Sequence, residues 1–411
     1  QVTTMYGMFL SASAFNHDIS SWTGTAATTA QENMFEQATA FQAKFTCDNA
    51  ITGPAGSCNT IKSSWVAPSP PPSPPLPPPL VMPLLVEQQK LVADDGSEGE
   101  YFGYSVAIDE DTIVVGPETR DGSVYVYVHS KENTWSLQQE IFPNDPQSSQ
   151  YFGYVVAISG DTIVVGSQGY LVDDSEPNQG SVYVFVRSGA TWTQQQKIIA
   201  SDGKSYEYFG RGLAISGDSV AIASFGSYST GGSLYVFVRS EQTWSLQQKI
   251  TASDGAPDDG FGTWRVNLDM DGNTLAVGSP QDDDNGSNSG SARIYIRSEN
   301  TWSLQQKLLA SDGEPSDLFG GAVSIDGDTV VVAAYEDDDK GENSGSVYVF
   351  VRSENTWMLE QKIVSDDGFE YDGLGSSVAL SGNTIVVSVP IDADKGRNSG
   401  SAYIFVRSDS T

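Results

Sequence analysis

The sequence predicts an all-β protein whose main domain is a six-bladed β-propeller. A Phe-Gly pair returns at intervals of 50 to 58 residues, and in the last of six copies it has become Leu-Gly. Repeats of this length, each with several strands, are typical of propeller blades or solenoid coils. The abundance of Gly, Tyr, Val and Thr also favours strands. The pairs begin at Phe102, Phe152, Phe209, Phe261, Phe319 and Leu374.

Each unit contains four predicted strands, as a propeller blade requires. In the fifth unit the turn Asp326–Asp328 joins the first two strands as a tight hairpin. The Trp near the start of each fourth strand is expected to pack between blades rather than to stack on a sugar. The four strands of this unit are expected at residues 320–325, 329–333, 346–352 and 357–363.

The two ends of the repeat region predict how the ring closes. The last unit stops at Ser408–Thr411, where its fourth strand would begin, while Val86–Leu91 matches a fourth strand and nothing earlier in the unit. This N-terminal strand can therefore complete the last blade and remove the open edges of the ring. Closure in this way gives six blades, and the alternative of seven would need sequence beyond residue 411.

Residues 84–411 form this propeller domain, and from residue 86 onward they resemble the FG-GAP repeat family, whose blades also occur in the heads of integrin α-subunits. The resemblance rests on recurring phrases: Ser-Asp-Gly-x4-Asp-x-Phe-Gly, Ala-Ile-Ser-Gly-Asp-Thr-Ile-Val-Val-Gly and Gly-Ser-Val-Tyr-Val-Phe-Val-Arg-Ser. It implies a β-propeller that serves adhesion or ligand binding at a cell surface.

Residues 1–67 contain a shorter repeat, because the pattern of Met8–Asn16 returns as Met34–Gln42. A unit of this length suits a leucine-rich-type solenoid, and two coils cannot bury a continuous core. We therefore expect a small solenoid-like cap that ends a longer array. Together with Asp18–Trp22, the pattern resembles the BspA-like surface repeats. That resemblance implies a surface or secreted, non-catalytic protein, and the start at Gln1 suggests a processed chain or a fragment.

Residues 68–83 are dominated by proline, which predicts an extended polyproline II linker acting as a spacer. The segment also resembles hydroxyproline-rich glycoproteins of algae and plants. This resemblance implies O-linked sugars at Ser69, Pro70, Pro71, Pro72, Ser73, Pro74 and Pro75.

Two further features fit an extracellular location. Cys47 and Cys58 are the only cysteines, and their spacing suits either a small disulfide, which we favour, or two free thiols. Asn285 begins an Asn-Gly-Ser sequon for N-glycosylation.

The net charge of −32 limits the classes of partner. Binding to nucleic acid or anionic lipid depends on clustered Lys and Arg, which this chain lacks. An acidic surface favours cations and basic partners instead. No run approaches the roughly 20 apolar residues of a membrane span. We therefore expect neither a nucleic-acid partner nor direct insertion into a membrane.

Acidic residues gather in two sets of loops that a propeller places on one face. These are the 2–3 loops, between the second and third strands of a blade, and the 4–1 loops, between successive blades. The 4–1 loops carry the pairs Asp254 and Asp259, Asp312 and Asp317, and Asp367 and Asp372. Arginines at the ends of third strands lie toward the other face. The simplest interpretation is a solvated surface that keeps the protein soluble.

Three 2–3 loops share the pattern Asp-x-Asp-x-Gly-x-Asn-x-Gly, which predicts Ca²⁺. Alternating oxygen ligands around a turn containing Gly suit a cation that takes about six to eight oxygens. Three ligands leave that shell incomplete, so a modest affinity is expected. The metal loop that the FG-GAP resemblance implies lies elsewhere, and only Asn267–Asn273 keeps its core. The candidate ligands are Asp282, Asp284 and Asn288; Asp337, Asp339 and Asn343; and Asp392, Asp394 and Asn398.

Catalytic motifs are scarce. His17 and His129 are the only histidines, and no Ser-His-Asp set or phosphate-binding Gly loop stands out. We therefore predict a non-catalytic extracellular protein that acts in adhesion or recognition. It would bind a protein or glycan ligand through a propeller face, with Ca²⁺ assisting. The alternatives are a structural subunit of a wall, matrix or surface appendage that packs against other copies of itself, and, less favoured, a glycoside hydrolase.

Overall fold

The chain divides into two compact units, Gln1–Val86 and Glu87–Thr411. In the part of the chain that the structure describes, every regular element is a β-strand, so the all-β class is confirmed. The computed structural model describes residues 45–46, 60–61, 89–93, 96, 100–118, 122–130, 134–145, 151–168, 179–203, 207–225, 231–256, 259–262, 267–366, 368–393 and 399–407.

The first unit contributes one small antiparallel sheet. β1 (Phe45–Thr46) pairs with β2 (Thr60–Ile61), with Thr46 opposite Thr60. This register brings together the chain segments next to Cys47 and Cys58, although both cysteines lie outside the described residues. The solenoid-like cap, the linker at 68–83 and its sugar sites also lie outside them and stay predictions.

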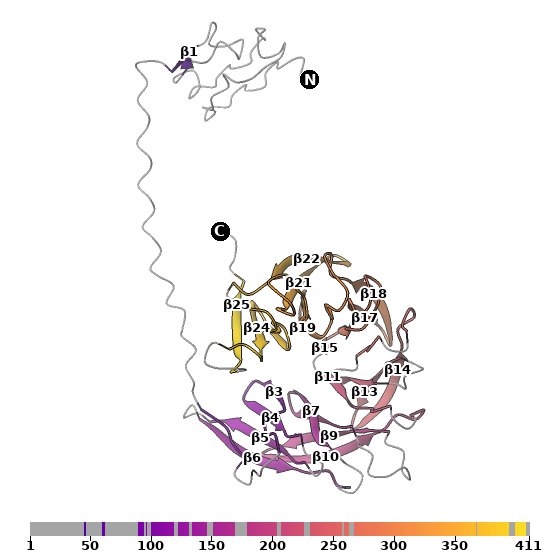
Figure 1. Cartoon of the computed structure of the whole chain (residues 1–411). Coiled ribbons are helices and arrows are strands. Elements are labelled where there is room, and N and C mark those ends of the chain that lie inside the picture. Colours follow the sequence, from indigo (N-terminus) through magenta and orange to yellow (C-terminus); the bar gives the residue numbers. More distant parts are fainter. Residues whose placement is uncertain are drawn as a thin grey trace. The chain divides into compact units, whose positions relative to one another are not determined.

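The second unit is the predicted six-bladed propeller (Figure 1). Blade 1 contains β3 (Ser105–Asp109), β4 (Thr112–Gly116), β5 (Val124–His129) and β6 (Trp135–Ile141). Blade 2 contains β7 (Phe152–Ser159), β8 (Thr162–Ser167), β9 (Ser181–Ser188) and β10 (Thr191–Ile198). Blade 3 contains β11 (Gly212–Ser216), β12 (Ser219–Ser224), β13 (Ser233–Ser240) and β14 (Thr243–Ile250).

The remaining three blades repeat this order, and the strands of blade 5 match the predicted ranges to within two residues. Blade 4 contains β15 (Leu268–Asp271), β16 (Thr274–Ser279), β17 (Ser291–Ser298) and β18 (Thr301–Leu308). Blade 5 contains β19 (Ala322–Asp326), β20 (Thr329–Ala334), β21 (Ser346–Ser353) and β22 (Thr356–Ile363). Blade 6 contains β23 (Val378–Ser381), β24 (Thr384–Val389) and β25 (Ser401–Val406).

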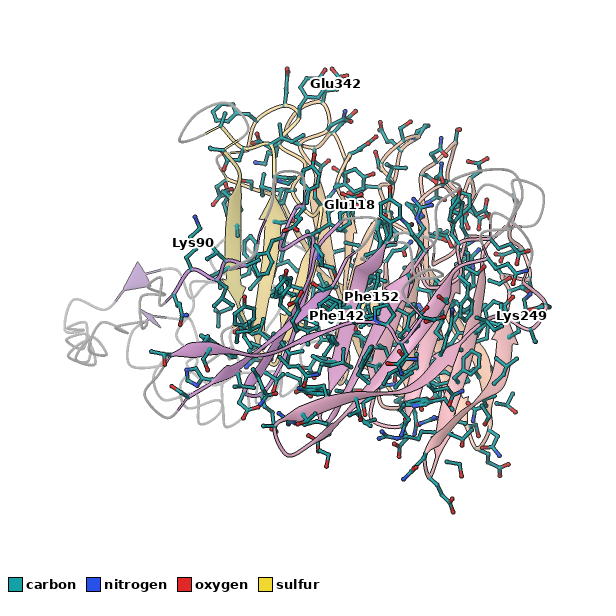
Figure 2. The ribbon with its side chains drawn as sticks, turned by 90° about the horizontal axis from the view of Figure 1, so that it is seen from below. Lys90, Glu118, Phe142, Phe152, Lys249 and Glu342 are labelled. Atoms are coloured by element: carbon teal, nitrogen blue, oxygen red, sulfur yellow. The ribbon has the colours of Figure 1, made fainter. Side chains whose placement is uncertain are left out.

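The Phe-Gly pair is part of the scaffold. Phe319 is fully buried and packs edge-to-face on Tyr348, with ring centroids 5.1 Å apart. Gly320 has φ +91°, and a Cβ there would lie 2.2 Å from the Ser291 carbonyl oxygen, so only glycine fits. Figure 2 shows the corresponding Phe152 among the strands and Glu342 at the tip of a loop.

A repeated pair of Gln and Trp joins neighbouring blades. Gln306 lies on β18, the fourth strand of blade 4, and Trp357 lies on β22, the fourth strand of blade 5. The side-chain amide of Gln306 donates to Trp357 O at 2.8 Å, and its Oε1 accepts from Trp357 N at 2.8 Å. Gln305 Oε1 accepts from the indole Nε1 at 2.8 Å. Burial of the Trp between blades is therefore confirmed. The same two-bond clamp joins Gln139 to Trp192, Gln196 to Trp244, and Gln248 to Trp302.

The predicted closing strand lies at the limit of the described residues. Residues 86–88 are outside them, and the sixth sheet contains three strands within the described ranges. Gln89 nevertheless makes the clamp with Trp135 of blade 1, at 2.8 Å for both bonds. Relative to blade 1, Gln89 takes the place of a fourth-strand Gln. Its pairing with β25 stays a prediction.

The faces of blades 1 and 6 that would meet in a closed ring are apolar and exposed. Val106 and Ile108 on β3 are 64% and 63% exposed, whereas the corresponding Val156 and Ile158 on β7 are 5% and 9% exposed. On the facing side of blade 6, Ile404 on β25 is 44% exposed. We call these two apolar faces the seam; it consists of Val106 and Ile108 on blade 1 and Ile404 and Val406 on blade 6.

Candidate functional site

The carboxylates of the predicted Ca²⁺ loops converge on lysine side chains. In blade 5 the Nζ of Lys362 lies 2.8 Å from Asp312 Oδ2, 2.9 Å from Asp337 Oδ2 and 2.6 Å from Asp339 Oδ2. Asp337 and Asp339 belong to the 2–3 loop of the blade, whereas Asp312 belongs to the 4–1 loop before it. One ammonium group therefore ties two loops of the same face together.

Strand register explains the position of this lysine. Lys362 on β22 lies opposite Tyr348 on β21, whose hydroxyl lies 3.0 Å from Asp312 Oδ1 and 2.9 Å from Asp337 Oδ2. Burial acts to lower the pKa of Lys362, but hydrogen bonds to Asp312 and Asp339 outweigh burial and raise that pKa. The lysine is therefore held in its charged form and acts as an internal cation.

Blade 4 adds a second cation to the same arrangement. Arg293 is fully buried and lies opposite Lys307 on the neighbouring strand. In blade 5 the corresponding position is occupied by Tyr348. Its guanidinium donates to Asp282 Oδ2 at 2.8 Å and to Asp254 Oδ1 at 2.9 Å. Lys307 Nζ contacts the same two carboxylates and lies 2.6 Å from Asp284. Partial burial acts to raise the pKa of Asp254, but Lys307 and Arg293 outweigh it and lower the pKa to about 2.

The lysine bridge also occurs in blades without the Asp-x-Asp loop. Lys197 Nζ lies 2.5 Å from Asp145 Oδ2 in the preceding 4–1 loop, and Lys249 Nζ lies 2.6 Å from Asp202 Oδ2. The bridge is thus part of the repeated scaffold. The Asp-x-Asp loops of blades 4 and 5 add further carboxylates to a cation that is already present.

The asparagines of the predicted loops shape turns. Asn288 and Asn343 have φ values of +55° and +54°, a region that Asn tolerates better than most residues. Their backbone N–H groups donate to Asp283 and Asp338, each at 2.7 Å. The positive φ explains why the pattern has Asn at this position, without a role for its side chain in binding a metal.

The third predicted loop is described only in part. Asp392 is buried, whereas Asp394 and Asn398 lie outside the described residues. Within the described ranges, no group of three or more His, Cys, Asp or Glu side chains is placed to hold a metal ion. A Ca²⁺ ion at the first two loops would have to compete with Lys307 and Lys362. The Ca²⁺ site stays a prediction.

The N-glycosylation sequon lies in the blade 4 loop. Asn285 is exposed, and its Nδ2, the atom that would carry a sugar, donates to Ala310 O at 3.0 Å. Glycosylation at Asn285 also stays a prediction.

In the 4–1 loops before blades 4 and 5, the second Asp accepts a hydrogen bond from a backbone N–H of its own loop. Asp259 accepts from Ala256 N at 2.7 Å, and Asp317 accepts from Glu314 N at 2.7 Å. Burial raises the pKa of Asp317 to about 6, and nearby carboxylates add to the effect. Much of the predicted anionic face is therefore engaged in contacts within the protein.

The arginines at the ends of the third strands serve the opposite face in a similar way. Arg187 Nε donates to Asp161 Oδ1 at 2.6 Å, Nη1 donates to Thr112 Oγ1 of blade 1 at 3.1 Å, and the guanidinium lies over the Trp192 ring. His129 takes this position in blade 1 and lies against the ring of Trp135. Corresponding contacts are made by Arg239, Arg297, Arg352 and Arg407.

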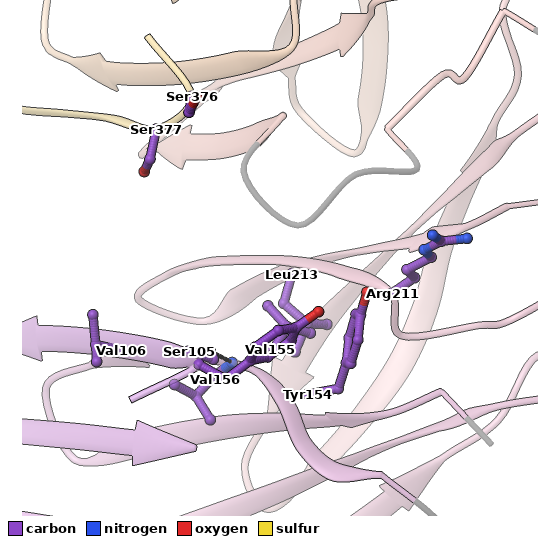
Figure 3. Close-up of a pocket in the computed structure, with 10 residues that line it drawn as sticks. Ser105, Val106, Tyr154, Val155, Val156, Arg211, Leu213, Ser376 and Ser377 are labelled. Carbon is purple, nitrogen blue, oxygen red and sulfur yellow. Dashed lines mark hydrogen bonds between the residues drawn. The ribbon is translucent and has the colours of Figure 1, made fainter. Parts of the chain in front are cut away.

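A cavity of about 510 Å³ lies among the first strands of blades 1, 2, 3 and 6. In Figure 3, Ser376 and Ser377 lie across this axial pocket from Tyr154 and Leu213, with Arg211 toward one end. These side chains follow the 4–1 loops, so the pocket opens among the loops of the acidic face. The polar and aromatic lining residues are Tyr104, Ser105, Tyr154, Arg211, Ser376 and Ser377.

The aromatic residues around the pocket come from one half of the ring. The rings of Tyr104 and Tyr154 lie 5.3 Å apart. One residue before each Phe-Gly pair, Tyr101, Tyr151 and Tyr208 have φ values of +50°, +58° and +45°. A bulky residue in this region costs roughly 1–3 kcal/mol. Leu318 takes this position in blade 5 with φ +57°, and Gly260 and Gly373 take it in blades 4 and 6, so the backbone geometry is shared by all six blades.

Our sequence reasoning did not identify this pocket. A signal was present, because the first two units read Tyr-Phe-Gly-Tyr and the third reads Tyr-Phe-Gly-Arg. The later units have lost both flanking residues. The residues on either side of the Phe-Gly pair therefore distinguish the first three blades from the later ones.

No helix capable of crossing a bilayer occurs among the described residues.

Comparison with known proteins identifies the repeat. A family model described as FG-GAP repeat matches residues 85–127, 135–185, 192–237, 244–295, 302–350 and 357–405. A second model, described as a Mycoplasma protein of unknown function, DUF285, matches residues 1–51. This match neither supports nor excludes the BspA-like resemblance.

Solved structures with a related shape are distant in sequence. A protein from Lactobacillus plantarum is 13% identical, with a TM-score of 0.47 over 75% of this chain and 81% of that one. Saccharomyces cerevisiae Sqt1 is 10% identical, with a TM-score of 0.41 over 75% of this chain and 86% of its own. No curated protein is significantly similar in sequence.

Proposed function

The chain belongs to the FG-GAP repeat family, and on that premise we propose that it is a non-catalytic recognition protein of the cell surface or extracellular space. It binds a protein or glycan ligand at the propeller face where the axial pocket opens. The Pro-rich segment at 68–83 and the acidic composition support the extracellular location.

The axial pocket is the observation that carries this proposal. Its volume of about 510 Å³ falls within the roughly 300–1,000 Å³ typical of ligand sites. Its lining combines tyrosine rings, serine hydroxyls and one guanidinium, which can orient a ligand as well as bury it.

The acidic loops are better suited to holding the face rigid than to binding a partner directly. In blade 5, Asp312, Asp337 and Asp339 all contact Lys362. A partner that used these carboxylates would first have to replace their contacts with the lysine. These acidic loops are therefore held in place by contacts within the protein.

A pocket-filling variant tests the proposal. Ser377→Trp in the full chain adds bulk to the lining, so binding of the labelled protein to a glycan array and to a surface-protein array should be lost. Asn355→Ser, on an exposed turn of the opposite face, serves as the control. Unchanged binding by Ser377→Trp would contradict recognition at the pocket.

The seam favours a second candidate function, a structural subunit that packs against other copies. Ile404 and Val406 are 44% and 50% exposed on the outermost described strand of blade 6. Exposed apolar strands at a sheet edge are prone to pair with another chain. Light scattering during size-exclusion chromatography separates the candidates: concentration-dependent oligomers that disappear in Ile404→Lys support assembly, and a strict monomer rejects it.

The third alternative, a glycoside hydrolase, gains no support from the contacts described above. The proposal therefore remains a non-catalytic one.

A further inference from the structure

Arg211 differs from the other described arginines in its partners. Arg187, Arg239, Arg293, Arg352 and Arg407 each form an ion pair with a carboxylate, and Arg297 donates hydrogen bonds to the side chains of Asn273 and Ser219. Among the described residues, Arg211 has no ion pair, and its guanidinium lies 5.2 Å from the ring centroid of Phe225 and 5.9 Å from that of Tyr208. In a chain with net charge −32, a guanidinium that bonds no other described side chain is unexpected.

The two aromatic contacts leave the hydrogen-bonding edge of Arg211 available. An arginine that packs on aromatic rings keeps its planar fork of N–H donors, which matches a carboxylate in two parallel hydrogen bonds. Such contacts also limit the motion of the side chain, so less conformational entropy is lost when a ligand binds. Arg211 is therefore suited to receive an anionic group at one end of the pocket.

The rest of the pocket has a different chemistry. Tyr104 is half-buried and offers aromatic surface, whereas Tyr154 is only 7% exposed and packs against the Tyr104 ring. Ser376 and Ser377 on the facing side are half-buried. A small inorganic anion would leave the aromatic surface without a partner. A purely hydrocarbon acid would cover the serine hydroxyls without replacing their hydrogen bonds with water.

From this combination we propose that the axial pocket binds a sugar acid, with its carboxylate on Arg211 and its ring against Tyr104. This inference rests on the proposed function and specifies its ligand class. Ser376 and Ser377 meet the sugar hydroxyls. The ligand carries few charges, because the strongly negative protein repels a long polyanion.

Matched ligands test the role of the carboxylate. The methyl glycosides of galacturonic, glucuronic and mannuronic acid are titrated against the full chain by NMR, together with the carboxyl methyl ester of each. At least one acid should bind roughly tenfold or more tightly than its ester, because a hydrogen bond to a charged group is worth about 1.5–3 kcal/mol. Absence of binding by all three acids, or equal binding of acids and esters, overturns the inference.

Variants then locate the contact. Arg211→Gln should weaken binding of the acid roughly tenfold or more and leave the ester unchanged. Tyr104→Ala should weaken both, and the matched control Lys340→Gln, an exposed cation on the same face, should change neither. Thermal midpoints of all three variants show whether the fold is kept, and Arg211→Lys with partial recovery supports a charge effect.

The two proposals fail separately. If Arg211→Gln binds the acid as wild type does while Ser377→Trp abolishes array binding, the sugar-acid inference is wrong and recognition at the pocket stands. If Ser377→Trp leaves array binding unchanged, recognition at the pocket fails whatever the titrations show.

Discussion

Replacing Arg293 by Met should strongly destabilise the propeller. The side chain is fully buried and donates to Asp282, Asp254, Ser279 and Ser291 at 2.8 to 3.1 Å. Without Arg293, the negative charge of the buried Asp282 is balanced by Lys307 alone. Removing one partner of a buried ion pair typically costs about 3–5 kcal/mol, and we expect a loss in that range.

A comparison with blade 5 sharpens this prediction. Tyr348 occupies the position of Arg293, and its hydroxyl contacts the corresponding two carboxylates, Asp312 and Asp337. Arg293→Tyr should therefore cost only about 1 kcal/mol, since a neutral hydrogen bond replaces the charged one and Lys307 remains. Size alone does not explain the difference, because Met and Tyr both fill much of the space.

Urea unfolding at pH 7, followed by tryptophan fluorescence, measures both variants. The double variant with Asp282→Asn tests the cause: it should be more stable than Arg293→Met alone, because no uncompensated carboxylate is left. Equal losses for Met and Tyr, or no recovery in the double variant, would refute the reasoning.

Three other predictions concern separate contacts. Asp317→Asn should stabilise the protein by about 3 kcal/mol above pH 6 and have little effect below pH 4. The native pKa of about 6 exceeds the unfolded value, so wild-type stability falls as the pH rises between them; pH-dependent denaturation checks this. Gln306→Ala should cost about 1–3 kcal/mol, because Trp357 loses both backbone partners; a urea midpoint within error of wild type would contradict the clamp. Lys362→Met should raise Ca²⁺ affinity in titration calorimetry and Asp339→Asn should reduce it again; no heat in any variant removes the metal prediction.

The repeat made most of the fold predictable. A period of 50 to 58 residues with four apolar runs defines both the blade and its strand order. The fourth-strand Trp could be assigned to packing because it recurs with the Gln-Gln that follows it. The same regularity placed the 2–3 and 4–1 loops on one face.

The chemistry of the site was less predictable, because its contacts join distant segments. Lys362 is 25 residues from Asp337 and 50 from Asp312, and only strand register brings the three together. A pattern of alternating carboxylates does not indicate whether they contact a bound metal ion or a lysine side chain. Arg211 was equally hidden, since its lack of a carboxylate partner is a property of the fold.

The Gln–Trp clamp bears on how the number of blades in such a ring can change. Each of the first five units carries both halves of its joint: a Trp that receives the clamp from the fourth strand before it and a Gln in the same strand that can clamp the next Trp. An additional unit, copied in frame, would bring matching connections at both ends. Ring size can therefore vary by whole blades without a new interface, while the residues around the axis diverge independently.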